Sequence, residues 1–345
     1  MGQVTKQEPI KSSFGPKSTA KDVIKKYNLR GKNAIVTGGY SGVGLEITKA
    51  LARAGVNVLV PVRNIQKAQA SLKNIPNVKM DTINLMEPDS IDAFAERFLA
   101  TGEPLHILIN DAGIMAPPLR RDSRGYESQF STNHLGHFQL TARLWPALKK
   151  ANGARVVAVS SRAQRLGGIN FEDIHYDTTE YIPMKAYAQS KTANVLFAVE
   201  LDRRAKEFGV RAFAAHPGLV PMTNLGNSQL PDNTSYFIKW LANLMPKIMK
   251  GLNGTAFLNL LKRIKPHHIG DEFKNTRQGA ATPIWCAVSN DLTDMGGVYC
   301  EDCNIAEAVT DSTSPFGILP WAIDPVHATR LWSLSEELTG VKFEL

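Results

Sequence analysis

Residues 33–44 read NAIVTGGYSGVG and join two different sequence patterns. The first five, NAIVT, form a short, largely apolar run typical of a strand that is buried on both faces. From Leu45 the sequence continues LEITKALARA, whose apolar residues recur at helical spacing. Gly38, Gly42 and Gly44 lie between the two, where glycine permits a tight turn and lets N–H groups at a helix N-terminus approach a pyrophosphate. This context predicts a dinucleotide-binding β–α junction, with a purely structural glycine turn as the alternative.

The alternation of strand and helix patterns continues along the chain. Helical spacing is found in SIDAFAERFLA and TANVLFAVELDRRAKEF. Continuous apolar strands separated by helices indicate a parallel sheet covered on both faces. We therefore expect the α/β class, with a Rossmann-type doubly wound sheet of about seven strands in a single domain over residues 30–345. The expected strands after the first are 56–62, 78–83, 105–110, 154–160, 210–215 and 296–300.

Two segments stand outside this alternation. Within residues 1–29, the polar stretch 1–17 predicts a mobile tail and residues 18–27 predict a short helix. Residues 221–278 predict a helical insertion before the last strand, because large apolar residues recur there at helical spacing, apart from the lysines. Three interpretations stay open for the insertion: a helix packed on its own domain, a lid over a hydrophobic substrate, or a helix in weak peripheral contact with a membrane surface.

The composition limits the kind of protein. The chain has 345 residues, of which 43% are apolar and 8% aromatic, enough for a large core. Its net charge of +8 is concentrated in residues 1–30 and 228–274, so that the remaining residues are nearly neutral. That distribution argues against a broad surface for nucleic acid. No apolar stretch approaches the roughly 18 residues of a membrane-spanning helix, so we expect no integral membrane insertion and a soluble, cytoplasmic protein.

Metal binding is not expected. Cys300 and Cys303 form a single CxxC pair, and Cys286, with no suitably spaced histidine pair, does not complete the four ligands of a structural zinc site. Three cysteines also fit a reducing compartment. We interpret them as ordinary buried or half-buried thiols.

The end of the second expected strand bears on the choice of cofactor. The stretch VLVPVRN closes with Arg63, and no Asp or Glu stands nearby. An acid at this point usually meets a free ribose 2′-hydroxyl, whereas a 2′-phosphate requires a cation. The sequence thus favours NADP(H) over NAD(H), with a merely solvated arginine as the alternative.

A tyrosine and a lysine are candidate catalytic residues. Tyr187 and Lys191 in AYAQSK are four residues apart, which on a helix places phenol and ammonium on one face, about 5–6 Å apart. Alone, such a pair is more typical of a solvated helix face. The chain contains six motifs in a fixed order: TGGYSGVG, ILINDAG, STNHLGHFQLT, VVAVSS, YAQSK and HPG. Together they resemble the short-chain dehydrogenase/reductase family, in its retinol-dehydrogenase and WW-domain-oxidoreductase-like branch, over residues 30–340.

The resemblance implies a catalytic tetrad of Asn133, Ser161, Tyr187 and Lys191. In it, Ser161 would bind the substrate oxygen and Tyr187 would give that oxygen a proton, while hydride comes from the nicotinamide. A free tyrosine has a pKa of about 10, which we expect Lys191 and a cationic nicotinamide to lower. Lys191 would also hold the nicotinamide ribose, and Asn133 would support the active-site helix and a water leading to Lys191. Ser161 is preferred to Ser160 because the family usually uses the second serine of the pair.

The resemblance also implies cofactor contacts, with three departures from the family pattern. Asn84 and Leu85 stand where the family has Asp-Leu beside the adenine. Asp111 replaces the second Asn of Asn-Asn-Ala-Gly and places an acid beside the expected cleft. The stretch HPGLVPMTNL is one residue longer than usual, around Val220 and Thr223. The implied cofactor-binding residues are Gly38, Tyr40, Ser41, Gly42, Val43, Gly44, Arg63, Asn84, Leu85, Asn110, Ala112, Gly113, Tyr187, Lys191, Pro217, Gly218, Val220 and Thr223.

These observations lead to an expected function. The chain is expected to be an NADP(H)-dependent oxidoreductase that interconverts a carbonyl and an alcohol on a bulky hydrophobic or aromatic small molecule. An NADP(H)-binding regulatory or scaffold protein of the same fold is the alternative. An epimerase or dehydratase would share the Tyr-x-x-x-Lys pair but has a different glycine pattern. A dimer paired through helices that flank the sheet also stays open.

Overall fold

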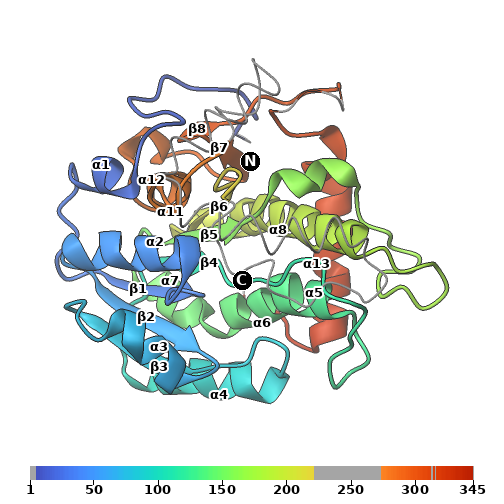
Figure 1. Cartoon of the computed structure of the whole chain (residues 1–345), viewed down its shortest axis with the longest axis horizontal. Coiled ribbons are helices and arrows are strands. Elements are labelled where there is room, and N and C mark those ends of the chain that lie inside the picture. The colour runs from blue at the N-terminus through green and yellow to red at the C-terminus, as the bar shows by residue number, and fades with distance from the viewer. Residues whose placement is uncertain (1–4, 221–272, 312–313, 315, 345) are drawn as a thin grey trace, which may run out of the picture.

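The computed structural model describes residues 5–220, 273–311, 314 and 316–344. Thr223 and most of the expected insertion at 221–278 therefore lie outside the described residues. Figure 1 shows the described part as a twisted sheet with helices on both sides.

The sheet has eight strands in the order β3-β2-β1-β4-β5-β6-β7-β8. The first seven are parallel to their neighbours, and the two-residue β8 runs antiparallel to β7. The expected doubly wound α/β sheet is thus confirmed, with one short strand added. The strands are β1 Asn33–Thr37, β2 Asn57–Val62, β3 Val78–Thr82, β4 Ile107–Asn110, β5 Arg155–Val159, β6 Arg211–Ala215, β7 Val298–Glu301 and β8 Asn304–Ile305.

Helices cover the sheet in two layers. The first layer, α1, α2, α3 and α12, shares a core with Ala34 and Val36 of β1, whereas Ile35 between them packs into the second layer of α4, α6, α7, α8 and α13. This alternation explains the continuous apolar run of β1, because both faces of the strand are buried. The α-helices are α1 Ala20–Ile24, α2 Gly42–Arg53, α3 Ile65–Leu72, α4 Pro88–Ala100, α5 Ser128–Phe130, α6 Gly136–Arg143, α7 Trp145–Lys150, α8 Pro183–Ala205, α11 Thr276–Gly279, α12 Ala281–Val288 and α13 Pro325–Thr339. The shorter helices are η1 Ser131–Leu135, η2 Arg162–Leu166, η3 Lys206–Phe208, η5 Asn290–Leu292 and η6 Pro320–Ala322.

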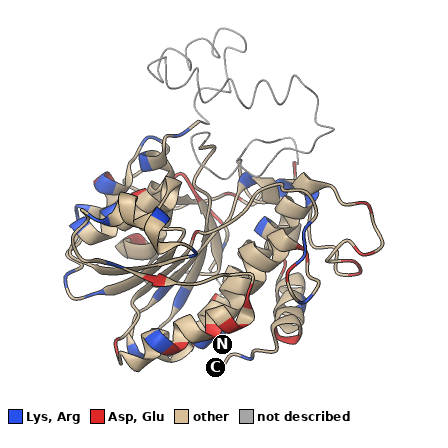
Figure 2. Cartoon of the chain, turned by 60° about the horizontal axis from the view of Figure 1, so that its bottom comes forward, with Lys and Arg blue, Asp and Glu red and all other residues tan. Residues whose placement is uncertain are grey.

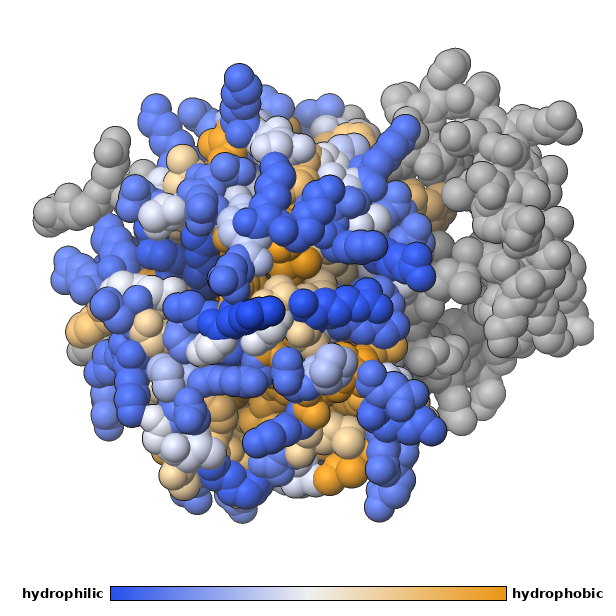
Figure 3. Space-filling view, turned by 90° about the vertical axis from the view of Figure 1, so that its left-hand side faces the viewer, coloured by the Kyte–Doolittle hydropathy of each residue, from blue (hydrophilic) through white to orange (hydrophobic). Residues whose placement is uncertain are grey.

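The outer surfaces of the covering helices are polar. Figure 2 shows Lys and Arg interspersed with Asp and Glu along these helices. The face around α1, α2 and α3 is largely hydrophilic, with apolar side chains showing between the charged ones (Figure 3). Such a surface is what amphipathic helices produce when their apolar side packs on a sheet.

The C-terminal helix covers α8, the longest helix of the described chain. Most residues of α8 are buried, because α13 packs along it. The ring of Trp332 on α13 lies over Phe197 of α8 with centroids 6.1 Å apart, and over Phe138 of α6 at 5.1 Å. The helix α8, which contains Tyr187 and Lys191, is therefore closely packed on this side.

The N-terminal segment differs from the expected mobile tail. In its described part, the amide group of Gln7 donates to the carbonyls of Tyr299 at 2.8 Å and Ala306 at 2.6 Å, and it accepts from the N–H of Tyr299 at 2.9 Å. The segment therefore satisfies backbone groups at the edge of the sheet, which sequence patterns alone do not reveal. The expected short helix is present as α1, capped by Thr19.

The strand order places a crevice at one point of the sheet. Strand β1 pairs with β2 on one side and with β4 on the other, so the chain reverses direction across the sheet between β1 and β4. In open α/β sheets, ligands bind at the carboxyl ends of the strands at such a point. The site is therefore expected where β1 and β4 end.

Candidate functional site

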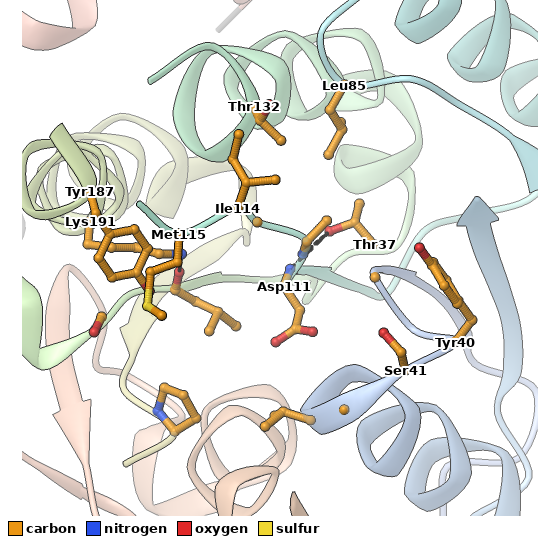
Figure 4. A pocket seen from close by; sticks show the side chains of 18 of the residues that line it. Thr37, Tyr40, Ser41, Leu85, Asp111, Ile114, Met115, Thr132, Tyr187 and Lys191 are labelled. Atoms are coloured by element: carbon orange, nitrogen blue, oxygen red, sulfur yellow. Dashed lines mark hydrogen bonds between the residues drawn. The ribbon is translucent and has the colours of Figure 1, made fainter. Parts of the chain in front are cut away.

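A cavity of about 770 Å³ lies at the carboxyl ends of the strands. Most of the predicted residues line it: Gly38, Tyr40, Ser41, Gly42, Val43, Arg63, Asn84, Leu85, Ala112, Gly113, Ser161, Tyr187, Lys191, Pro217, Gly218 and Val220. Three others, Gly44, Asn110 and Asn133, lie behind its wall, and Thr223 is outside the described residues. The structure thus gathers residues from seven separate stretches of sequence around one space, as Figure 4 shows in part.

The glycine loop after β1 fits a dinucleotide. Gly38 and Gly42 have φ angles of +69° and +54°, which favour glycine. A Cβ atom on Gly44 would stand 2.5 Å from the carbonyl oxygen of Gly38, so only glycine lets the helix start this close to the loop. Ser41, the N-cap of α2, makes no side-chain capping hydrogen bond. Uncapped N–H groups at a helix N-terminus are suited to binding a pyrophosphate.

Asn133 lies in a π-helical turn, η1, between α5 and α6. Its amide oxygen accepts from the N–H of Ile114 at 2.9 Å, and its amide nitrogen donates to the carbonyl of Ile114 at 3.0 Å and to the hydroxyl of Ser190 at 2.9 Å. The side chain therefore ties the loop after β4 to α8. A Cβ on Gly113 would lie 3.1 Å from the Asn133 oxygen and 3.5 Å from the Lys191 nitrogen, so a side chain there would crowd the Asn133 amide. Single π turns are frequent at functional sites.

Two residues that the sequence analysis did not select hold this wall of the cavity. The hydroxyl of Thr37 accepts from the N–H groups of Asp111 at 2.9 Å and Ala112 at 3.0 Å, and it lies 2.9 Å from Nε2 of His137. Nδ1 of His137 lies 3.0 Å from the carbonyl oxygen of Asn133. Because a carbonyl only accepts, Nδ1 carries the proton and the Thr37 hydroxyl donates to Nε2. Burial lowers the pKa of His137 to about 4, so the ring is neutral.

Tyr187, Ser161 and Lys191 meet at the other end of the cavity. The hydroxyl of Ser161 lies near the phenol of Tyr187, close enough to lower its pKa. The ammonium of Lys191 lies 5.7 Å from the centre of the Tyr187 ring and donates to the carbonyl of Val159 at 3.0 Å. The hydroxyl of Ser160 donates to the backbone carbonyl of Lys191 at 2.7 Å, and both serines line the cavity. The choice of Ser161 over Ser160 stays a prediction.

The pKa values around Tyr187 differ from the sequence expectation. Burial raises the pKa of Tyr187 to about 12, the hydroxyl of Ser161 opposes this, and the nearby Asp111 adds to it. Burial lowers the pKa of Lys191 to about 8, which Asp111 opposes. Burial also raises the pKa of Asp111 to about 6, against Lys191 and the N–H of Gly44. In the protein alone, desolvation therefore outweighs the attraction that was expected to make the phenol acidic.

The far end of the cavity carries positive charge. Arg63, at the end of β2, and Lys67, in the first turn of α3, are both exposed and line the cavity. Lys67 was not selected from the sequence, and its spacing of four residues from Arg63 was the available signal. Asn84 also lines the cavity, but its amide nitrogen donates to Glu87 at 2.7 Å. The adjacent Asp81 pairs with Arg97 at 2.9 Å and does not line the cavity.

Asn110 has a supporting position. It is buried at the end of β4, and its amide nitrogen donates to the hydroxyl of Thr141 on α6 at 3.2 Å. It thus fixes the strand from which the cavity wall begins.

Apolar side chains line the cavity beyond Tyr187 and Ser161. Met115 and Pro117 come from the loop after β4, and Leu219, Val220 and Phe273 come from the loops after β6. Leu219 and Phe273 are bridged as in a parallel sheet. The exit and the return of the 221–272 segment are thereby held side by side at this end of the cavity.

The described part of the chain contains no group of three or more His, Cys, Asp or Glu side chains that could hold a metal ion. The thiols of Cys286, Cys300 and Cys303 are free and buried. Among the residues that the structure describes, no helix has the length and apolarity needed to cross a membrane.

Known proteins match both the sequence and the fold. A model of the short chain dehydrogenase family matches residues 32–234. Retinol dehydrogenase 12 of Mus musculus is 36% identical over 322 residues, which cover 92% of this chain and 89% of the relative. The chloroplastic short-chain dehydrogenase TIC 32 A of Brassica napus is 35% identical, with 95% of each chain covered. A solved structure of an uncharacterized protein from Mycobacterium paratuberculosis has a TM-score of 0.68 and 30% identity, and covers 95% of this chain and 99% of that one.

The chain therefore belongs to the short-chain dehydrogenase family, within the branch of the retinol dehydrogenases. It is an oxidoreductase, and the cofactor of its family is a nicotinamide dinucleotide. The RhlG/NADP complex of Pseudomonas aeruginosa, with a TM-score of 0.56 and 20% identity over 79% of this chain and 94% of that one, shares the fold.

Proposed function

We propose that the chain is an NADP(H)-dependent oxidoreductase that interconverts a carbonyl and an alcohol on a bulky hydrophobic or aromatic small molecule. The observation that carries the proposal is that Ser161, Tyr187 and Lys191 line one cavity, with the ammonium of Lys191 5.7 Å from the centre of the Tyr187 ring. A phenol and a hydroxyl that face one cavity side by side are placed to share one ligand oxygen.

The bound cofactor would supply or accept hydride at its nicotinamide ring. During reduction, Ser161 donates to the substrate oxygen and Tyr187 transfers its proton to that oxygen. Lys191 stabilises the resulting phenolate through its charge. In this role Asn133 keeps α8 in register with the loop after β4, through its bonds to Ser190 and Ile114.

The preference for NADP(H) rests on the cations at the end of β2. Arg63 and Lys67 line the cavity from two adjacent elements, and Asp111 is the only acid among the described lining residues. A 2′-phosphate would meet two positive charges there and no carboxylate, which favours the phosphorylated dinucleotide.

The substrate class follows from the apolar end of the cavity. Met115 lies beside the Tyr187 ring (Figure 4), and Leu219, Val220 and Phe273 add apolar surface to the same cavity. A hydrophobic or aromatic ketone or aldehyde would bury its apolar body there while its oxygen reaches the two hydroxyls.

The test is NADPH oxidation with a panel of bulky ketones, aldehydes and quinones. Tyr187→Phe should slow turnover by roughly 10²–10⁴-fold, the usual contribution of a general acid. Tyr27→Phe, whose hydroxyl bonds only to Ser289 at 3.4 Å outside the cavity, is the matched control and should turn over as the parent does. Equal turnover by Tyr187→Phe would overturn the assigned acid. Tight NADPH binding without turnover of any compound would instead favour the regulatory alternative.

A further inference from the structure

Asp111 is an acid in a cavity proposed to receive an anionic cofactor. The mechanism above does not use it, and the family pattern has an uncharged Asn at this position. Figure 4 shows its carboxyl pointing into the cavity, between the start of α2 on one side and Tyr187 and Lys191 on the other. No other acid lines the cavity among the described residues.

The carboxyl is held in this place by its surroundings. It lies against Gly44, in the first turn of α2, whose N–H lowers its pKa. The backbone N–H of Asp111 donates to the hydroxyl of Thr37 at 2.9 Å, and the N–H of Ala112 donates to the same hydroxyl at 3.0 Å. A Cβ on Gly44 would stand only 2.5 Å from a carboxyl oxygen of Asp111. The carboxyl therefore occupies the same helix N-terminus that would bind the pyrophosphate.

The charges that face this carboxyl come from several elements. Lys191 and Tyr187 face it from α8, and Lys191 is the charge that acts on it most strongly. Behind Lys191 lie the neutral His137 of α6 and His216 after β6, each disfavoured as a cation by that lysine. The other titratable groups around the site are Tyr40, Arg63, Lys67, Arg120 and Lys274.

We propose that Asp111 sets the affinity for the cofactor through its proton: the carboxyl is neutral when a dinucleotide is bound, so binding takes up a proton at this residue and weakens as the pH rises. A pyrophosphate on the amide groups of α2 would bring negative charge next to an ionised Asp111, and protonation removes that repulsion. The neutral carboxyl still accepts from Gly44 through its carbonyl oxygen and gains a hydrogen that it can donate. This inference rests on the proposed binding of a dinucleotide but not on turnover.

The proton at Asp111 also links binding to chemistry. An ionised Asp111 raises the pKa of both Tyr187 and Lys191. Neutralising it on binding removes one cause of the high pKa of the phenol. Protonation of Asp111, which accompanies cofactor binding, thus also makes Tyr187 a stronger acid.

The test is calorimetric titration with NADP⁺ and NAD⁺ between pH 6 and pH 8, each in two buffers of different ionisation heat. The carboxyl has a pKa of about 6 in the free protein. Above that pH, the Kd of the dinucleotide should rise by up to about tenfold per pH unit, because binding requires Asp111 to take up one proton. A 2′-phosphate itself titrates near pH 6, so NAD⁺, which lacks it, separates the two effects.

Asp111→Asn is the matched variant, since the amide keeps the shape and the acceptor for Gly44. It should abolish the proton uptake assigned to Asp111, and at pH 8 it should bind the dinucleotide about ten- to a hundredfold more tightly than the parent. Asp294→Asn is the control; Asp294 is an exposed acid that precedes β7, at the amino end of the parallel strands, and its substitution should change nothing.

The inference is overturned if the parent takes up no proton with NAD⁺ in either buffer, a result that does not depend on any variant. It is also overturned if Asp111→Asn keeps the pH dependence of the parent or binds more weakly at every pH. Titration without substrate separates this result from the proposed function: a protein that binds but does not turn over still decides the role of Asp111. Failure of both dinucleotides to bind would overturn both proposals.

Discussion

The hydroxyl of Thr37 lies 2.9 Å from Nε2 of His137 and joins the first strand of the sheet to the helix that follows the π turn. The same oxygen accepts from the N–H groups of Asp111 and Ala112. A single hydroxyl therefore positions the loop that carries Asp111 and, through His137, the carbonyl of Asn133. Because all of these groups are buried or half-buried, water can replace the lost hydroxyl only in part.

Thr37→Val tests this network. The substitution keeps the shape of the side chain but leaves two N–H groups and Nε2 of His137 without a partner. We expect the free energy of unfolding to fall by about 2–5 kcal/mol, since each buried unsatisfied group costs about 1–3 kcal/mol. Denaturant unfolding followed by circular dichroism measures the change. Thr37→Ser retains the hydroxyl and should lose much less; an equal loss would show that the methyl packing, not the hydrogen bonding, matters.

Ser160 and Ser161 form a natural pair for separating structure from chemistry. Ser161→Ala should slow carbonyl reduction by roughly 10²–10³-fold, the usual effect of removing one donor to a reacting oxygen. Ser160→Ala removes the bond to the carbonyl of Lys191 and should lower the free energy of unfolding by about 1–2 kcal/mol, with a rate change below about tenfold. Steady-state kinetics and denaturant unfolding on both variants check this. The reverse pattern would assign the catalytic hydroxyl to Ser160.

Arg63 and Lys67 should set the choice between the two dinucleotides. Arg63→Ala and Lys67→Ala should each raise the Kd for NADPH about 10–100-fold, the usual value of a charge-assisted hydrogen bond. The Kd for NADH should stay within about threefold, because it has no 2′-phosphate. Fluorescence titration measures both constants. Lys73→Ala, at the opposite end of α3, is the control and should leave the ratio of the two constants unchanged.

Asp111 should also make stability depend on pH. Its pKa is raised in the folded protein, from 3.8 to about 6. A carboxyl with a raised pKa contributes stability below its unfolded pKa, and this contribution is lost as the pH rises through the folded pKa. Without cofactor, Asp111→Asn should therefore exceed the parent in free energy of unfolding above pH 6, by up to about 3 kcal/mol at pH 8, and by less at pH 5. Denaturant unfolding at these two pH values decides; a constant difference would mean that Asp111 does not titrate in this range.

Sequence patterns predicted the sheet because strand and helix periodicity are local, whereas most of the residues lining the cavity were implied by the resemblance to the family. A buried strand followed by glycines and a helix specifies the junction at residues 33–44, and the strand order then brings the ends of β1, β4 and β5 together. The contacts of Asn133 with Ser190 and Ile114 depend on a π turn that no local pattern marks. Likewise, the partner of His137 is 100 residues away in the sequence.

The electrostatic balance was the least predictable part of the site. The sequence shows that Tyr187 and Lys191 are neighbours, which favours a lowered pKa for the phenol. Burial acts in the opposite direction, and its size depends on how closely the surrounding elements pack. Asp111 could be recognised as a departure from the family pattern, but the sequence does not tell that its carboxyl points toward α2 and Lys191.

The hydrogen bonds between Gln7 and β7 have a consequence for the order in which the protein folds. The amide and its partner at Tyr299 are separated by 292 residues. During synthesis Gln7 emerges before its partner strand, so it cannot form these hydrogen bonds until residues 299–306 have also been made. Until then, the backbone groups that Gln7 satisfies stay open to other strands.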